Sequence, residues 1–356
     1  MRRLLLLALL LGASLAAQPA QAPVRFPEVV PGTPIRLPRD HGAHPDFRTE
    51  WWYLTGWLQT PDGKPLGFQI TFFRSRPAIS SDNPSPFAPR QILFAHAALS
   101  DPAASKLSHD QRLARAGLGL AEAGTENTAI RLLDWTLDRR ADGRFRAVIP
   151  AKGFALDLDF TPTQPAMANG AAGYSRKGPR PEQASYYFSM PQLAVRGRVI
   201  RGGRAVAVTG RGWLDREWSS TLLPRQAVGW DWAGINLDDG GALMAFQVRG
   251  GDGRPVYAGG TFRRPDGNQT VLAPDQVRFV PRRRWRSPDS GAAYPVATDI
   301  LVRLPGGERR FPLRPLMDAQ ELTGGPGMPT YWEGAVTTDG GRGYLEMTGY
   351  AGKLSL

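Results

Sequence analysis

Apolar and polar residues alternate along much of the chain, in short runs separated by turn residues. Phe68, Ile70 and Phe72 occupy every second position of one run, and residues 154–160 repeat the pattern. A period of two places successive side chains on opposite faces, which is typical of a β-strand with one buried side. No segment keeps a helical period. The pattern predicts an all-β protein.

Glycine-containing turns join these runs into antiparallel hairpins. The predicted hairpins pair residues 50–58 with 66–73, 186–200 with 205–218, 230–237 with 242–248, and 331–337 with 343–350. Residues 92–99 predict a further strand, and we expect any short helix within residues 101–128. Many short strands at close spacing indicate sandwiches or barrels.

The same theme of hairpins and glycine turns occurs in both halves of the 356-residue chain. At roughly 150 residues per domain, the length suggests two domains. We therefore expect two antiparallel β-barrels in tandem, over residues 41–220 and 221–356, after an irregular lead-in at residues 23–40.

The N-terminus has the pattern of a secretory signal peptide. Arg2 and Arg3 precede an apolar run at residues 4–11, and small residues follow to Ala22. The apolar run is shorter than the ~20 residues that span a bilayer. Residues 1–22 are thus expected to be removed, leaving an exported protein, periplasmic or secreted, with no transmembrane segment in the mature chain.

The net charge of +12 is spread thinly, and its densest patch is residues 282–286. Nucleic-acid binding needs a concentrated basic face, so no nucleic-acid partner is expected and the patch is interpreted as a solvated loop or a contact with an anionic surface. Phosphate loops, dinucleotide fingerprints and cysteine-based sites are absent from the sequence, so no cofactor is predicted. The sequence leaves the oligomeric state open.

Residues 212–220, GWLDREWSS, carry the main candidate chemistry. In a strand, Trp213, Asp215 and Glu217 share one face, opposite Leu214, Arg216 and Trp218. Burial among tryptophans raises the pKa of an acid, so Asp215 is the candidate general acid and Glu217 its assistant. The alternative is structural, with either acid paired to a buried arginine such as Arg74.

Three further residues are candidates for catalysis, namely Glu50, His44 and His96. Glu50 could assist Asp215 or bond to a turn, and each histidine could be a general base or a core residue. His41 and His44 lack further ligands, so no metal site is predicted. An aromatic-lined barrel suits an apolar ligand. The predicted ligand-binding residues are Trp52, Tyr53, Tyr187, Trp213, Trp218, Trp230 and Trp232.

Several motifs together resemble the lipocalin-like proteins grouped with AttH and carotenoid 1,2-hydratase (hydroxyneurosporene synthase). The motifs are residues 44–53, 67–74, 95–101, 187–191, 212–218, 229–232 and 343–350. The resemblance covers roughly residues 40–353 and implies tandem lipocalin-like β-barrels.

The hydratase branch of this family adds water across a terminal isoprenoid double bond, using an aspartic acid in an apolar tunnel. Its motif resembles Tyr-His-Asp-His-Asn, where this chain has Trp213-Leu-Asp-Arg-Glu. Asp215 matches the aspartate, whereas Leu214 and Arg216 replace the histidines. The match extends to the acid and not to its neighbours.

Three functions follow from these observations. The favoured interpretation is an exported protein that binds a hydrophobic small molecule, of the isoprenoid or lipid class, in a barrel cavity. The second is an enzyme in which Asp215 acts as the acid of a hydratase, isomerase or cyclase. The third is an envelope scaffold without a ligand, and the sequence alone does not decide whether there is turnover.

Overall fold

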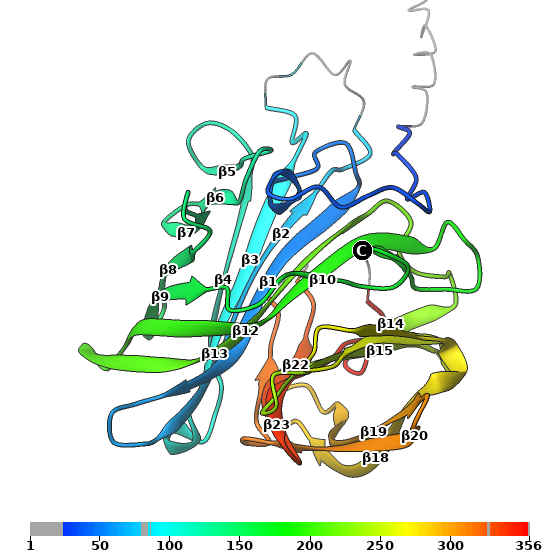
Figure 1. The fold of residues 1–356 in the computed structure, drawn as a ribbon. Helices are drawn as coiled ribbons and strands as arrows, with labels where there is room; N and C mark the ends of the chain where they lie inside the picture. Colours follow the sequence, from blue (N-terminus) through cyan, green and yellow to red (C-terminus); the bar gives the residue numbers. More distant parts are fainter. Residues whose placement is uncertain (1–23, 80–84, 86, 326–327, 355–356) are drawn as a thin grey trace, which may run out of the picture.

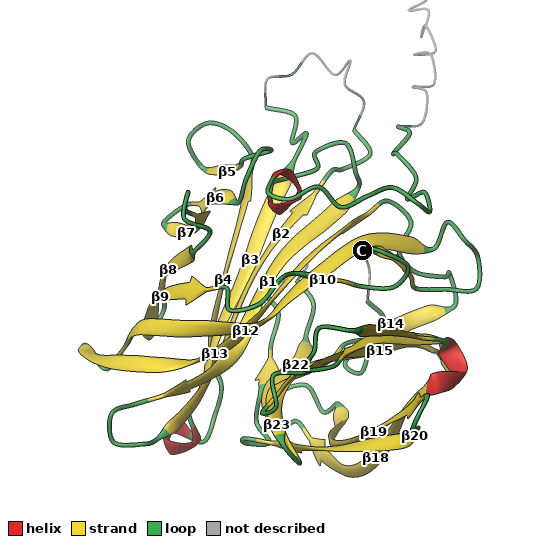
Figure 2. Cartoon of the chain, in the orientation of Figure 1, coloured by secondary structure: helices red, strands yellow, loops and turns green. Residues whose placement is uncertain are grey.

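The computed structural model describes residues 24–79, 85, 87–325 and 328–354. The expected signal peptide lies outside these ranges. Nearly all of the described chain is strand or loop, as Figure 2 shows. The all-β prediction is confirmed. Within the described residues no helix is long and apolar enough to cross a membrane.

The strands form two antiparallel sheets, coloured blue to green and green to red in Figure 1. The first sheet holds β1 (Thr49–Gln59), β2 (Pro65–Ser75), β3 (Ile92–Ser100), β4 (Ser108–Arg115), β5 (Ala121–Ala123), β6 (Ala129–Leu132), β7 (Trp135–Arg139), β8 (Phe145–Ala151), β9 (Phe154–Thr161), β10 (Met167–Ala168), β11 (Tyr174–Arg176), β12 (Ala184–Arg201) and β13 (Arg204–Ser219).

The second sheet begins after a short connection, at residue 227. It holds β14 (Ala227–Leu237), β15 (Ala242–Gly250), β16 (Pro255–Arg263), β17 (Gln269–Leu272), β18 (Val277–Arg286), β19 (Ala293–Leu304), β20 (Gly307–Pro315), β21 (Glu321–Leu322), β22 (Tyr331–Thr338) and β23 (Gly341–Met347). Three short 3-10 helices are η1 (Arg39–His41), η2 (Pro102–Ala104) and η3 (Pro274–Gln276).

The four predicted hairpins are confirmed, because β1–β2, β12–β13, β14–β15 and β22–β23 are antiparallel pairs. Each sheet curls around its own apolar core, with β4 contacting β6 and β8 in the first and β18 contacting β15 and β16 in the second. The centre of the first sheet, in the order β2-β1-β13-β12, turns its outer face toward β14, β15, β22 and β23.

Two predictions of local structure need correction. A short helix, η2, does form within residues 101–128, but η1 and η3 lie outside this range and most of it forms strands β4 and β5. The residues of β4 are mostly half-buried, so the strand lacks the clear alternation that the prediction relied on. Residues 282–286 are not a loop but the end of β18, an edge strand whose Arg282 and Arg283 pair with Asp299 and Asp318.

Candidate functional site

A cavity of about 340 Å³ lies between the two sheets rather than inside either of them. Its walls come from the outer faces of β1, β2, β3 and β13 on one side and of β14, β15, β22 and β23 on the other. The lining is mostly aromatic and aliphatic, and it includes Trp51, Phe73, Phe94, Trp230, Trp232 and Phe246. The expected barrel-interior site is therefore replaced by a site between the sheets, since side chains fill the interior of each sheet.

Strand β13 carries the predicted division of faces. Trp213 belongs to the apolar cluster between the sheets, and Asp215 and Glu217 line the cavity. Leu214 and Trp218 belong to the core of the first sheet on the opposite side. Both faces of β13 are thus buried, one by its own sheet and one by the second sheet.

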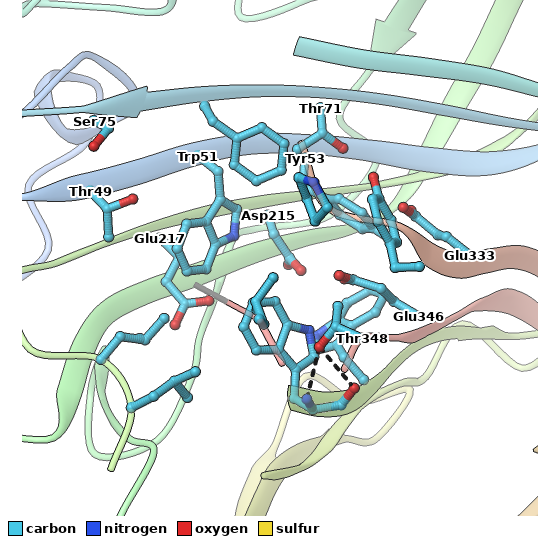
Figure 3. A pocket seen from close by; sticks show the side chains of 18 of the residues that line it. Thr49, Trp51, Tyr53, Thr71, Ser75, Asp215, Glu217, Glu333, Glu346 and Thr348 are labelled. Carbon is cyan, nitrogen blue, oxygen red and sulfur yellow. Dashed lines mark hydrogen bonds between the residues drawn. The ribbon is translucent and has the colours of Figure 1, made fainter. Parts of the chain in front are cut away.

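Asp215 is buried and accepts hydrogen bonds from neutral donors only (Figure 3 shows its position). Ser189 Oγ and Trp213 Nε1 donate to Oδ1 at 2.5 and 2.7 Å, and Tyr187 OH donates to Oδ2 at 2.7 Å. Trp232 Nε1 in turn donates to the Tyr187 hydroxyl at 3.0 Å. Burial raises the pKa of Asp215 to about 7, against the opposing effect of these donors. Asp215 is therefore both acid and base near neutral pH.

Glu217 lies two residues further along β13 in a different environment. Its carboxylate accepts a hydrogen bond from Ser185 and pairs with Lys177 at 2.9 Å. Lys177 is buried against the rings of Tyr187 and Phe246, each 4.6 Å away, and burial lowers its pKa. The cavity wall thus holds one ion-paired acid and one acid without a cationic partner.

Glu50 and His44 do not reach the cavity. Glu50 is fully buried on the inner side of the first sheet, where its carboxylate pairs with Arg74 and, at 2.9 Å, with Arg216. The backbone N–H of His44 donates to Glu50 at 2.9 Å, and the His44 ring stacks on Trp218. This is a structural ion-pair network, and the arginine partner expected for Asp215 or Glu217 belongs to Glu50 instead.

Trp52 and Trp218 also face the core of the first sheet, which corrects their expected place at the ligand. Four of the predicted ligand-binding residues do line the cavity, namely Tyr53, Tyr187, Trp230 and Trp232. Trp213 is not part of the lining, but it donates to Asp215 and packs edge-on against Trp232.

His96 lies behind the cavity wall. It is fully buried, and its Nδ1 is 2.8 Å from the hydroxyl of Tyr331, which lines the cavity. Burial lowers the pKa of His96 to about 3, so the imidazole is neutral. In this state His96 positions Tyr331 and carries no charge into the cavity.

Glu333 and Glu346 line the cavity and were not among the predicted residues. Both stand in otherwise apolar strand runs, YWEGAV and GYLEMT, on the alternate positions that face the first sheet. An acid inside such a run was the available sequence signal. Figure 3 shows both side chains beside Asp215, across the space between the sheets.

Comparisons with known proteins agree with this fold. A family model described as AttH-like matches residues 28–350. A crystal structure assigned to AttH from Nitrosomonas europaea is 52% identical and covers 91% of this chain and 99% of that chain, with a TM-score of 0.85. The predicted resemblance and the predicted lipocalin-like fold are confirmed.

Kievitone hydratase is a more distant relative. The protein from Fusarium solani subsp. phaseoli is 22% identical over 209 residues, which is 58% of this chain and 57% of that protein's length. The crystal structure of kievitone hydratase from Nectria haematococca covers 92% of this chain and 96% of that chain at 16% identity, with a TM-score of 0.67. At these identities the structural likeness concerns the fold.

Proposed function

Because the chain belongs to the AttH-like family, we propose that it binds an apolar small molecule of the isoprenoid or lipid class between its sheets and that Asp215 protonates it. One observation carries this proposal. An acid whose pKa is raised to about 7 lines a mainly aromatic cavity large enough for a small ligand. The kinship with kievitone hydratase supports a hydration reaction.

The proposed reaction is the addition of water to a carbon–carbon double bond. The proton of neutral Asp215 passes to one alkene carbon, and the positive charge develops on the more substituted carbon. Water attacks that carbon and releases a proton, so the product is an alcohol and the proton count is unchanged. The aromatic faces of Trp51, Trp230 and Trp232 would stabilise the developing cation.

Mass spectrometry of apolar extracts from the purified protein tests binding directly. Turnover is tested in deuterium oxide with 2,6-dimethyloct-2-ene, an apolar hydrocarbon with a terminal isoprenoid double bond and no ketone whose neighbouring hydrogens exchange. The native protein should introduce deuterium at carbon, and Asp215→Asn should slow this by roughly 10²–10⁴-fold, the usual contribution of a general acid.

Asp215→Asn should still bind the neutral fluorophore N-phenyl-1-naphthylamine, because the cavity lining is unchanged. The matched control is Asp275→Asn, at an exposed residue, which should leave deuterium uptake as in the native protein. Native rates of uptake in Asp215→Asn would contradict the assigned acid. Tight binding of extracted molecules without any incorporation of deuterium would favour a carrier protein over an enzyme.

We also propose that the protein is exported. The support is the sequence of residues 1–22, with its two arginines, short apolar run and small residues. N-terminal sequencing of the protein from cell fractions tests this, and an intact Met1 in cytosolic material would contradict it.

A further inference from the structure

Glu333 and Glu346 form a pair of carboxyl groups on the second sheet. They are direct cross-strand partners in the antiparallel ladder of β22 and β23, so their side chains leave the sheet on the same face. Both line the cavity (Figure 3). Glu333 is buried, and Glu346 is half-buried because its side chain meets the open space of the cavity.

Among the described residues, no lysine or arginine is found in an ion pair with either glutamate or among the main causes of their pKa shifts. Two like charges directly opposite each other on a sheet repel, and two adjacent buried carboxylates do not both ionise near neutral pH. Burial and the neighbouring carboxylate raise the pKa of Glu333 well above its ordinary value, and burial raises that of Glu346 to about 8.

Other ionisable groups around the pair do not supply the missing positive charge. Those that act on it are Asp215 and Glu217 from β13, Asp231 from β14, Tyr53 from β1 and Tyr331 from β22. All of them are acids or phenols. The surroundings therefore favour proton binding by the pair, and Glu346 releases its proton only near pH 8.

A packing role does not account for this arrangement. A buried carboxyl is costly unless it is paired or hydrogen-bonded. At this interface Glu217 pairs with Lys177 and Asp231 with Arg249. Asp215 accepts three hydrogen bonds instead. Oε1 of Glu333 makes no hydrogen bond of good geometry within the described chain. The hydroxyls of Tyr53 and Tyr331 lie near this carboxyl, and an oxygen that faces the cavity without a well-formed hydrogen bond is suited to hold a water molecule or a polar group of a ligand.

We propose that Glu333 and Glu346 are the second proton-transfer group of the cavity, binding the attacking water and accepting its proton. This inference rests on the proposed function. Asp215 on the first sheet gives a proton to the alkene carbon, and the glutamate pair on the second sheet, in its form with one ionised carboxyl, takes one from the water as the C–O bond forms. Asp215 ends ionised and the pair ends doubly protonated, so one proton returned to Asp215 completes the cycle.

The raised pKa of the pair is tested without any substrate. In protein labelled with carbon-13 at the glutamate carboxyls, one resonance should titrate near pH 8 in the native protein. Glu333→Gln and Glu346→Gln should each remove the mutual repulsion, so the remaining partner titrates lower. The matched control Glu308→Gln, at an exposed residue of β20, should leave the high titration in place. Ordinary titration of all glutamates in the native protein would overturn the inference.

Two isotopes then separate the two proton transfers during turnover of the hydrocarbon 2,6-dimethyloct-2-ene. In deuterium oxide enriched in oxygen-18, the native protein should introduce both labels. Glu346→Gln should lower oxygen-18 addition by roughly 10²–10⁴-fold yet retain deuterium uptake, since protonation by Asp215 remains and the cation reverts to an alkene. Asp215→Asn should lose both labels.

Oxygen-18 addition by Glu346→Gln at the rate of the native protein would overturn the role of the pair. An equal loss of both labels in this variant would also overturn it. If the native protein introduces neither label, the proposed function falls. The carboxyl titration decides the raised pKa of the pair in either case.

Discussion

Asp215 and Glu217 show how much the environment of a side chain decides its chemistry. They lie on the same face of β13, yet Glu217 has a lysine at 2.9 Å and Asp215 has only hydroxyl and indole donors. Neutral donors stabilise a carboxylate less than a cation does, so burial dominates at Asp215 and its pKa rises to about 7. The raised pKa thus belongs to an acid without a charged partner.

Tyr187→Phe tests this balance. The Tyr187 hydroxyl donates to Asp215, and a hydrogen bond to a charged group contributes about 1.5–3 kcal/mol. Its loss destabilises the carboxylate, so the pKa of Asp215 should rise from about 7 to above about 8. Carbon-13 titration of labelled aspartates measures the change. Tyr294→Phe, which removes a hydroxyl in the core of the second sheet, should leave Asp215 unmoved.

Glu50→Gln tests the structural role assigned to the network inside the first sheet. Burial alone would raise the pKa of Glu50, but the His44 hydrogen bond and the charges of Arg216 and Arg74 hold it well below its ordinary value. The ionised pairs therefore stabilise the fold above the ordinary glutamate pKa, and this contribution is lost as the pH falls.

Removing the Glu50 charge leaves two buried guanidinium groups, so the free energy of unfolding at neutral pH should fall by about 3–5 kcal/mol. Denaturant unfolding measures this. Glu122→Gln, in an exposed pair with Arg131, should change it by less than about 0.5 kcal/mol. A loss at Glu50 no larger than in this control would contradict the structural role.

At the scale of elements, the sequence predicts the strands well where one face is apolar. The alternation in residues 66–73 and 154–160 gives β2 and β9 directly. It also divides β13 correctly into two faces. The alternation does not say which face of a strand meets a ligand when both faces are buried. For this reason it does not separate Trp52 and Trp218, which face the core of the first sheet, from the residues that line the cavity.

The carboxyl pair on β22 and β23 makes the stability depend on pH. An unfolded glutamate releases its proton near pH 4.5, whereas Glu346 in the folded protein holds it to about pH 8. Between these values the folded state binds more protons than the unfolded state, so stability should fall as the pH rises.

Glu346→Gln removes the ionisable group, so its stability should decline less over this window. The gain relative to the native protein, greater near pH 8 than near pH 5, should be on the order of a few kcal/mol. Thermal unfolding across the window measures the difference. Native and variant curves that run parallel would show that Glu346 is ionised in the folded protein.

At the scale of the whole molecule, the site exists only where the two sheets meet. Asp215 and Glu346 are 131 positions apart in the sequence (346 − 215), and no local pattern connects them. The sequence predicts the acid on β13 because its motif is compact. It does not predict the partner strands, since the packing of one sheet on another depends on the shapes of both surfaces.

Trp57→Ala tests the contact between the sheets. Trp57 lies in the shared apolar cluster, and its Nε1 donates to the carbonyl of Gly343 at 3.0 Å. Its removal should lower the free energy of unfolding by about 3–5 kcal/mol, the usual cost of truncating a buried tryptophan. Looser packing admits water, so the pKa of Asp215 should also fall toward its ordinary value.

The control for this prediction is Trp285→Ala on β18, which packs against the core of the second sheet. It should lower stability without moving the titration of Asp215. The same titration shift in both variants would mean that Asp215 responds to general loosening and not to the contact between the sheets.

The division of the carboxyl groups between the sheets has a consequence for recombination. Each sheet is one continuous stretch of chain, and the connection at residues 220–226 belongs to neither. A chimera that exchanges the second sheet between two relatives would retain Asp215 while replacing Glu333, Glu346 and half of the aromatic wall. A single crossover in this connection would combine Asp215 of one relative with the cavity carboxyl groups of another. The reaction could then change within the family without any change of fold.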